Sequence, residues 1–155
     1  MRFALSPPLF AVVFFVLVLP VPKANGRLAD SPEVSQERYG KPLAVSQDGQ
    51  SLSYAKNGLQ IAAKFHEGKC GQISYRKSGA VTVELTDAEI AGLIAENCGA
   101  VPMAQVPAKK VGDRLWMDQA EGIGALYEWE TRTLTLITQK QLDRNIKEKE
   151  KKKQE

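Results

Sequence analysis

The sequence predicts an α+β fold made of two tandem units, each a helix followed by an antiparallel β-meander, with the helices packed on one face of the sheet. Two observations predict this fold. Signals for the start of a helix occur twice, and segments of alternating apolar and polar residues follow each of them. The two stretches, about 31–77 and about 86–139, also repeat a pattern in which Tyr54 corresponds to Trp116. In each unit the helix would cover a sheet face that cannot bury itself alone.

Residues 1–26 have the organisation of a secretory signal peptide. Arg2 supplies a positive start, residues 9–19 are an uninterrupted apolar run, and small residues follow around Ala24 and Gly26. The apolar run is shorter than the roughly 20 residues that a membrane-spanning helix needs. We therefore expect cleavage after Gly26 or Ala24 and an exported protein of the periplasm, the cell envelope or the medium. The alternative is an uncleaved membrane anchor.

The rest of the chain is long enough for one domain. We place this domain at residues 27–140, and we expect the charged tail at 141–155 to be a frayed helix or disordered. Without Arg2 and Lys23, the remaining chain has 19 basic and 18 acidic residues. A net charge so close to zero provides no general attraction for nucleic acid. We expect no nucleic-acid partner and no stable membrane anchor after cleavage.

The first unit begins with a short helix. Ser31 is a suitable N-cap, Pro32 suits the first helical position, and Gly40 ends the helix. Three segments with period-two alternation then predict strands, and Asn57-Gly58 joins the first two as a tight hairpin: 51–56, 59–65 and 71–76.

The register of the second hairpin follows from its apolar residues. Pairing Ala63 with Ile73 and Ile61 with Tyr75 keeps the apolar side chains on one face, because a slip of one residue would turn one set outward. This register places Cys70 in the connection between the strands or in a bulge.

The second unit begins with the best-defined helix of the chain, after Leu85. Thr86 and Glu89 form a capping-box pattern, and Gly99 is placed to end the helix. Apolar residues at positions 90, 93 and 94 share one helical face. Three further strands are predicted after it: 113–118, 123–129 and 132–138.

The chain has two cysteines, Cys70 and Cys98. In an exported protein, two cysteines are typical of one disulfide. The bridge would close a loop of 29 residues and would stabilise the fold by roughly 3–4 kcal/mol in the loop-entropy treatment. We predict this bridge, with two free thiols as the alternative.

Several motifs resemble those of a known group of proteins. They are Arg38-Tyr-Gly-Lys-Pro42, the Phe65-His-Glu-Gly-Lys69 turn followed by Ile73, and the helix at 85–93. Together they resemble exported bacterial proteins that carry the helix-plus-β-meander unit of β-lactamase-inhibitor-like proteins and of small outer-membrane-assembly lipoproteins. The resemblance covers about residues 31–138 and implies a non-enzymatic scaffold that contacts another protein. The lipidated cysteine of the assembly lipoproteins is absent, and no family site residue can be assigned.

Three aromatic residues are candidates for partner binding: Trp116, Tyr127 and Trp129. They fall on neighbouring predicted strands, so they can pack in the core beneath the second helix. Alternatively, they can form a partly exposed patch for a protein or glycan partner. Trp129 lies at the end of its strand and is the best candidate for exposure.

The residues that could carry catalysis are few. His66 is the only histidine and lies four residues before Cys70. These two residues could form a nucleophile and base, or could bind zinc together with Cys98, although structural zinc needs four ligands. We assign no catalytic residue, metal ligand or cofactor. The sequence favours an exported non-enzymatic scaffold or protein-binding module whose partner is another envelope protein. The alternative is a small extracytoplasmic hydrolase or metal-dependent enzyme that uses His66 and Cys70.

Overall fold

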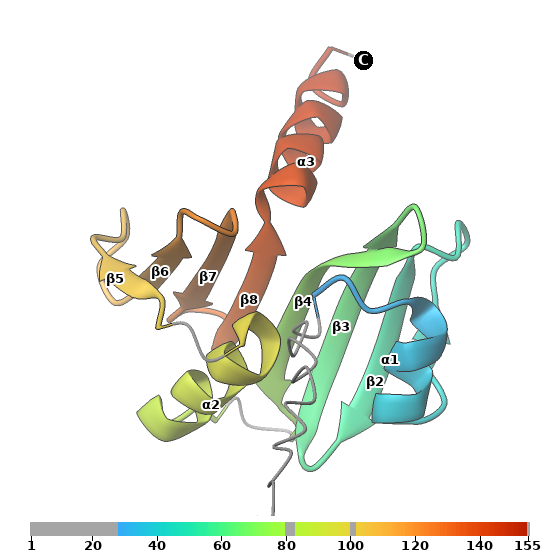
Figure 1. Ribbon diagram of the computed structural model, residues 1–155, viewed down its shortest axis with the longest axis horizontal. Helices are drawn as coiled ribbons and strands as arrows, with labels where there is room; N and C mark the ends of the chain where they lie inside the picture. Colours follow the sequence, from blue (N-terminus) through green and yellow to red (C-terminus); the bar gives the residue numbers. More distant parts are fainter. Residues whose placement is uncertain (1–27, 80–82, 100–101, 155) are drawn as a thin grey trace, which may run out of the picture.

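The computed structural model describes residues 28–79, 83–99 and 102–154 (Figure 1). The predicted signal peptide at 1–26 therefore lies outside the described residues. The helices are α1 (Pro32–Tyr39), α2 (Asp87–Cys98) and α3 (Gln139–Lys151). The strands are β1 (Ala44–Val45), β2 (Ser51–Lys56), β3 (Leu59–His66), β4 (Lys69–Lys77), β5 (Ala104–Val106), β6 (Arg114–Asp118), β7 (Ile123–Glu128) and β8 (Thr133–Thr138).

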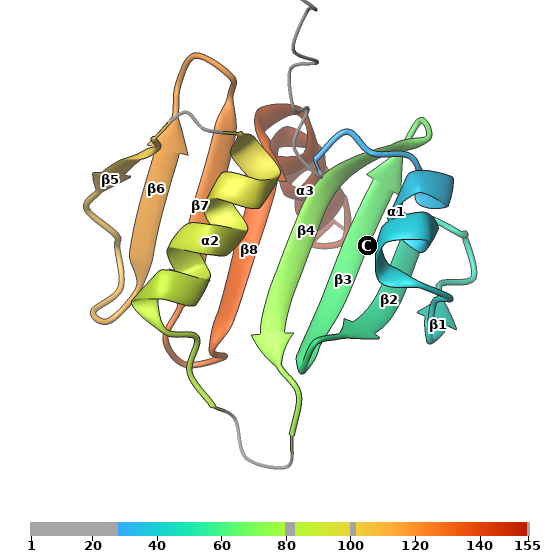
Figure 2. The ribbon, with the colours of Figure 1, turned by 60° about the horizontal axis from the view of Figure 1, so that its bottom comes forward.

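All eight strands belong to one antiparallel sheet, in the order β1-β2-β3-β4-β8-β7-β6-β5 (Figure 2). The predicted fold class, two tandem helix-plus-meander units at 31–77 and 86–139, is therefore wrong. The described residues form a single, mostly β structure with three helices. The join lies between β4 and β8, where Ile73 is opposite Leu136 and Tyr75 is opposite Leu134. Two separate meanders would leave these strands as unpaired edges, whereas pairing them satisfies their backbone groups and merges the apolar faces into one core.

Helices α1 and α2 cover the same face of this sheet (Figure 2). The strand residues beneath them form the core, and the largest fully buried strand side chains are Tyr54, Ile73, Tyr75, Tyr127, Leu134 and Leu136. The predicted register of the β3–β4 hairpin is confirmed, with Ala63 opposite Ile73 and Ile61 opposite Tyr75. Helices α1 and α2 thus cover one face of the sheet and leave the other face uncovered by them.

The helix starts are fixed by local hydrogen bonds. The side chain of Ser31 accepts from the amide of Val34 at the start of α1. The capping box of α2 is confirmed, because the Thr86 side chain accepts from the amide of Glu89 and the Glu89 carboxylate accepts from the amide of Thr86. These bonds satisfy backbone donors that the first turn of a helix leaves free.

A buried polar cluster connects the two covering helices through the sheet. The hydroxyl of Tyr75, on β4, lies 3.0 Å from the hydroxyl of Tyr39 on α1. It also lies 3.0 Å from Nδ2 of Asn97 on α2, and that Nδ2 donates to the carbonyl oxygen of Leu93 at 2.6 Å. Because these side chains are buried, the cluster fixes α1 and α2 to the same point of the sheet.

The predicted bridge between Cys70 and Cys98 is not formed, and both residues are free thiols. Cys70 is part of β4, opposite Phe65, and its Sγ lies 3.3 Å from the carbonyl oxygen of Gln72. The register of this hairpin shifts between Lys64 and Phe65, where β4 has one extra residue, Gly71, beside Cys70. The pairing with Phe65 keeps Cys70 inside the core, whereas Cys98 is held at the end of α2.

Helix α3 continues directly from β8 and is capped by Thr138. It contains most of the charged segment that the sequence predicts as a frayed or disordered tail. Its first turns dock on the sheet, where Gln141 is buried and Asn145 accepts from Lys64 and donates to Gln72. These contacts place α3 on the side of the sheet opposite α1 and α2 (Figure 2). None of the helices in the described residues is long and apolar enough to cross a membrane.

Candidate functional site

The face of the sheet that α1 and α2 leave uncovered is the candidate site, and we call it the open face. Successive side chains of a strand point to opposite faces, so the register identifies its residues. One continuous row crosses it: Ser53, Ala62, Ser74, Thr135, Leu126 and Leu115. Small and hydroxyl-bearing side chains occupy the first four positions, and leucines occupy the last two. The row is therefore low and flat over β2, β3, β4 and β8 and becomes apolar towards β6.

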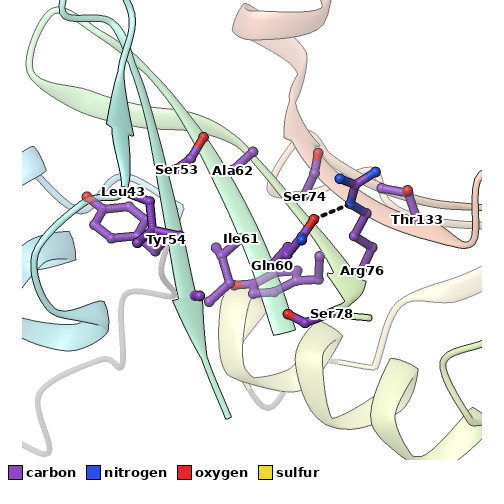
Figure 3. A pocket seen from close by; sticks show the side chains of 12 residues that line it. Leu43, Ser53, Tyr54, Gln60, Ile61, Ala62, Ser74, Arg76, Ser78 and Thr133 are labelled. Carbon is purple, nitrogen blue, oxygen red and sulfur yellow. Dashed lines mark hydrogen bonds between the residues drawn. The ribbon is translucent and has the colours of Figure 1, made fainter. Parts of the chain in front are cut away.

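A hollow of about 370 Å³ lies over the flat part of the open face (Figure 3). Its lining includes the short side chains of Ser53, Ala55, Ala62 and Ser74. Because these side chains extend little from the backbone, a ligand there can approach the strands closely. Longer side chains stand beside the hollow, and Arg76 is the one that carries a charge.

The apolar part of the open face lies over β6, β7 and β8. Met117 is 36% exposed, and Leu115, Leu126 and Ile137 are half-buried without belonging to the core. Helix α3 borders this part and carries two more exposed apolar side chains, Leu142 and Ile146, one turn apart. Adjoining polar and apolar areas of this kind are typical of surfaces that bind proteins.

The three predicted aromatic residues lie elsewhere. Tyr127 is 1% exposed, so its prediction as a partner-binding residue is wrong in this structure. Strand alternation turns it, together with Trp116, towards the covered face, where Trp116 is half-buried against the core. Trp129 follows β7 and is 43% exposed, with the guanidinium carbon of Arg132 4.5 Å from its ring centroid. Only Trp129 of the three is available on the surface.

The geometry around His66 and Cys70 does not favour catalysis. Both residues border a hollow of about 210 Å³ beside α3. Burial raises the pKa of the Cys70 thiol to about 12, and a smaller backbone hydrogen-bond contribution from Gln72 acts in the opposite direction. A nucleophilic cysteine needs the thiolate, which this pKa disfavours. His66 Nε2 lies 3.2 Å from Glu67 Oε1, so its nearest ionic partner is a carboxylate.

Cys98 has a different charged neighbour from Cys70. Burial raises the pKa of its thiol to about 11, and the charge of Asp118 raises it further. The charged neighbour of Cys70 is instead Asp30. Within the residues that the structure describes, no group of three or more His, Cys, Asp or Glu side chains is placed to hold a metal ion.

The residues of the open face are missing from the sequence-based candidates. Gln60, Ala62, Ser74 and Arg76 occupy the polar half of the alternation in β3 and β4, which predicts only that they face away from the core. The small size of Ala62 and Ser74 could have indicated the site, because solvent-facing strand positions commonly carry long charged side chains. Their assembly with β8 depends on the β4–β8 pairing, which joins segments about 60 residues apart in the chain.

Comparisons with known proteins give little similarity. No protein-family model matches the chain, and no curated protein matches it. Among solved structures, a DUF4309 family protein, YjgB from Bacillus subtilis subsp. subtilis str. 168, aligns with a TM-score of 0.40 and 12% sequence identity. The alignment covers 70% of this chain and 78% of that one.

Proposed function

We propose that this chain is a non-enzymatic binding module that acts outside the cytoplasm and holds a protein partner on the open face. One observation carries the proposal: α1 and α2 bury one face of an eight-stranded sheet, while the other face combines a flat strip of small side chains with an apolar end. Protein interfaces combine apolar and polar areas and require a rigid, complementary surface. A sheet anchored by a packed core supplies that rigidity.

The place of action is proposed from the N-terminus. The organisation of residues 1–26 is that of a signal peptide, and the resemblance to exported scaffolds points the same way. On this basis we propose that the partner is another protein of the cell envelope. Export is tested by the intact mass of the protein recovered from outside the cytoplasm. We expect a chain that begins at Arg27 or Asn25; a chain retaining Met1 in that fraction would contradict cleavage.

Site-specific crosslinking tests the binding surface. The photoreactive residue p-benzoylphenylalanine replaces Ala62, which is exposed on the open face. The matched control places it at Ala95, which is an exposed alanine of α2. Crosslinking is carried out in the cells that produce the protein, and the products are identified by mass spectrometry.

We expect a discrete crosslinked protein from position 62 and none from position 95. The identified protein should then bind the purified chain in solution. Equal products from both positions, or products from position 95 alone, would contradict the assignment of binding to the open face. The absence of any product from position 62 would contradict the proposed function.

A further inference from the structure

Arg76 stands out among the charged residues of the open face because its guanidinium is held in place by a neutral neighbour. Its Nε donates a hydrogen bond to Oε1 of Gln60 at 2.6 Å, across the β3–β4 pair (Figure 3). Gln60 and Arg76 are directly opposite each other in the register. The bond uses one edge of the guanidinium and leaves the two terminal nitrogens, Nη1 and Nη2, as a planar pair of donors.

Three other arginines each pair with a carboxylate. Arg38 pairs with Asp30, Arg114 with Asp87 and Arg132 with Glu84. Arg76 has no carboxylate within 4 Å among the residues that the structure describes. Lys64, the neighbouring cation on β3, is already engaged by Asn145 and Glu148 of α3. Of these two cations, Arg76 is therefore the one available to bind a ligand on the open face.

The surroundings of Arg76 limit what that ligand can be. The hollow beside it has hydroxyl groups from Ser74 and Thr133 and a low floor at Ala62 (Figure 3). One guanidinium matches one singly charged, planar group, and a carboxylate has the geometry to accept two parallel hydrogen bonds from it. A phosphate carries more charge and is usually held by several cations or by a helix N-terminus.

We infer that Arg76 is an anchor of the open face and binds the carboxylate of an Asp or Glu side chain presented by the protein partner. This inference rests on the proposed function and adds the chemistry of the partner to it. The carboxylate accepts hydrogen bonds from Nη1 and Nη2, while Gln60 keeps the guanidinium in place. The partner's backbone lies over the hollow, where the small side chains allow close approach.

A direct test uses a small carboxylate probe and does not need the partner. N-acetyl-glutamate N-methylamide is titrated into the purified chain and followed by the NMR signals of the Arg76 side chain and of the Ser74 and Thr133 amides. We expect saturable shifts that the matched glutamine compound does not produce. Arg76→Gln should abolish them, and Arg144→Gln, which changes an arginine of α3, should not. Equal shifts from the glutamate and glutamine probes would overturn the inference.

The crosslinking experiment separates this inference from the proposed function. Crosslinking from position 62 is repeated in Arg76→Gln, Arg76→Lys and Arg144→Gln backgrounds. We expect a loss of about tenfold in Arg76→Gln, an intermediate yield in Arg76→Lys, which keeps the charge without the planar pair of donors, and no change in Arg144→Gln. An unchanged yield in Arg76→Gln would overturn the role of Arg76 while leaving the open face as the binding surface.

Discussion

Removal of one hydroxyl group, in Tyr75→Phe, tests how the two covering helices are held on the sheet. The Tyr75 hydroxyl is buried and contacts the Tyr39 hydroxyl and the Asn97 side chain, each at 3.0 Å. A neutral hydrogen bond contributes about 1 kcal/mol net, and a buried amide that loses a partner costs about 1–3 kcal/mol more. We therefore expect the free energy of unfolding to fall by about 2–4 kcal/mol, a large share of a typical domain's total.

Tyr54→Phe is the matched control. Tyr54 is equally buried on β2, but its hydroxyl has no hydrogen-bond partner among the described residues. Removing that hydroxyl should leave the stability nearly unchanged or raise it slightly. Both variants are measured by urea unfolding, with near-ultraviolet circular dichroism to confirm native packing. A loss below about 0.5 kcal/mol for Tyr75→Phe, or equal losses in the two variants, would refute the reasoning.

Four further predictions concern two glycines and the thiols. Gly71→Ala should destabilise the protein by roughly 1–3 kcal/mol and speed amide exchange in α3, because a Cβ there would lie 2.8 Å from Oε1 of the buried Gln141; unchanged exchange would count against the docking of α3. Gly92→Ala, inside α2 with open space around it, should instead raise the urea midpoint by an amount equivalent to about 0.5–1 kcal/mol. The intact mass should be the same before and after reduction, because Cys70 and Cys98 are free thiols; a gain of two hydrogens would contradict this. Because burial raises the pKa of Cys70 from 9.0 to about 12, the unfolded chain loses its proton first, so the free energy of unfolding should fall between about pH 9 and pH 12.

Local features of the fold could be predicted from the sequence. The capping box at Thr86 and Glu89 uses side chains three residues apart, and the β3–β4 register follows from the alternation of apolar residues on both strands. What could not be predicted is the pairing of β4 with β8. Nothing in Ile73 or Leu136 alone specifies the other as its neighbour, because any two apolar strands can bury each other. The same limit explains the incorrect two-unit fold.

The disulfide prediction and the candidacy of Tyr127 for partner binding are wrong for a related reason, whereas Trp129 is exposed as expected. Expected export and the presence of two cysteines predict a bridge between Cys70 and Cys98. In the structure, the pairing of Cys70 with Phe65 fixes the Cys70 side chain in the core. Tyr127 is aromatic and on a strand, yet its face is decided by register with Leu134, which is fully buried. Arg76 carries no recognisable motif. It was identified as a candidate from the structure, because Gln60 opposite it holds the guanidinium and no described neighbour supplies a carboxylate to pair with it.

The central claim is that the open face, and not the helix-covered face, binds the partner. It is tested most directly by the affinity of the captured partner for two variants that each add one carboxylate at an exposed alanine. Ala62→Glu places it on the open face, which carries Arg76, and Ala95→Glu places it on the outer side of α2. We predict that Ala62→Glu weakens binding at least about tenfold, because its charge repels the carboxylate of the partner, and that Ala95→Glu leaves the affinity unchanged. Full affinity in Ala62→Glu, or a loss confined to Ala95→Glu, would contradict the claim.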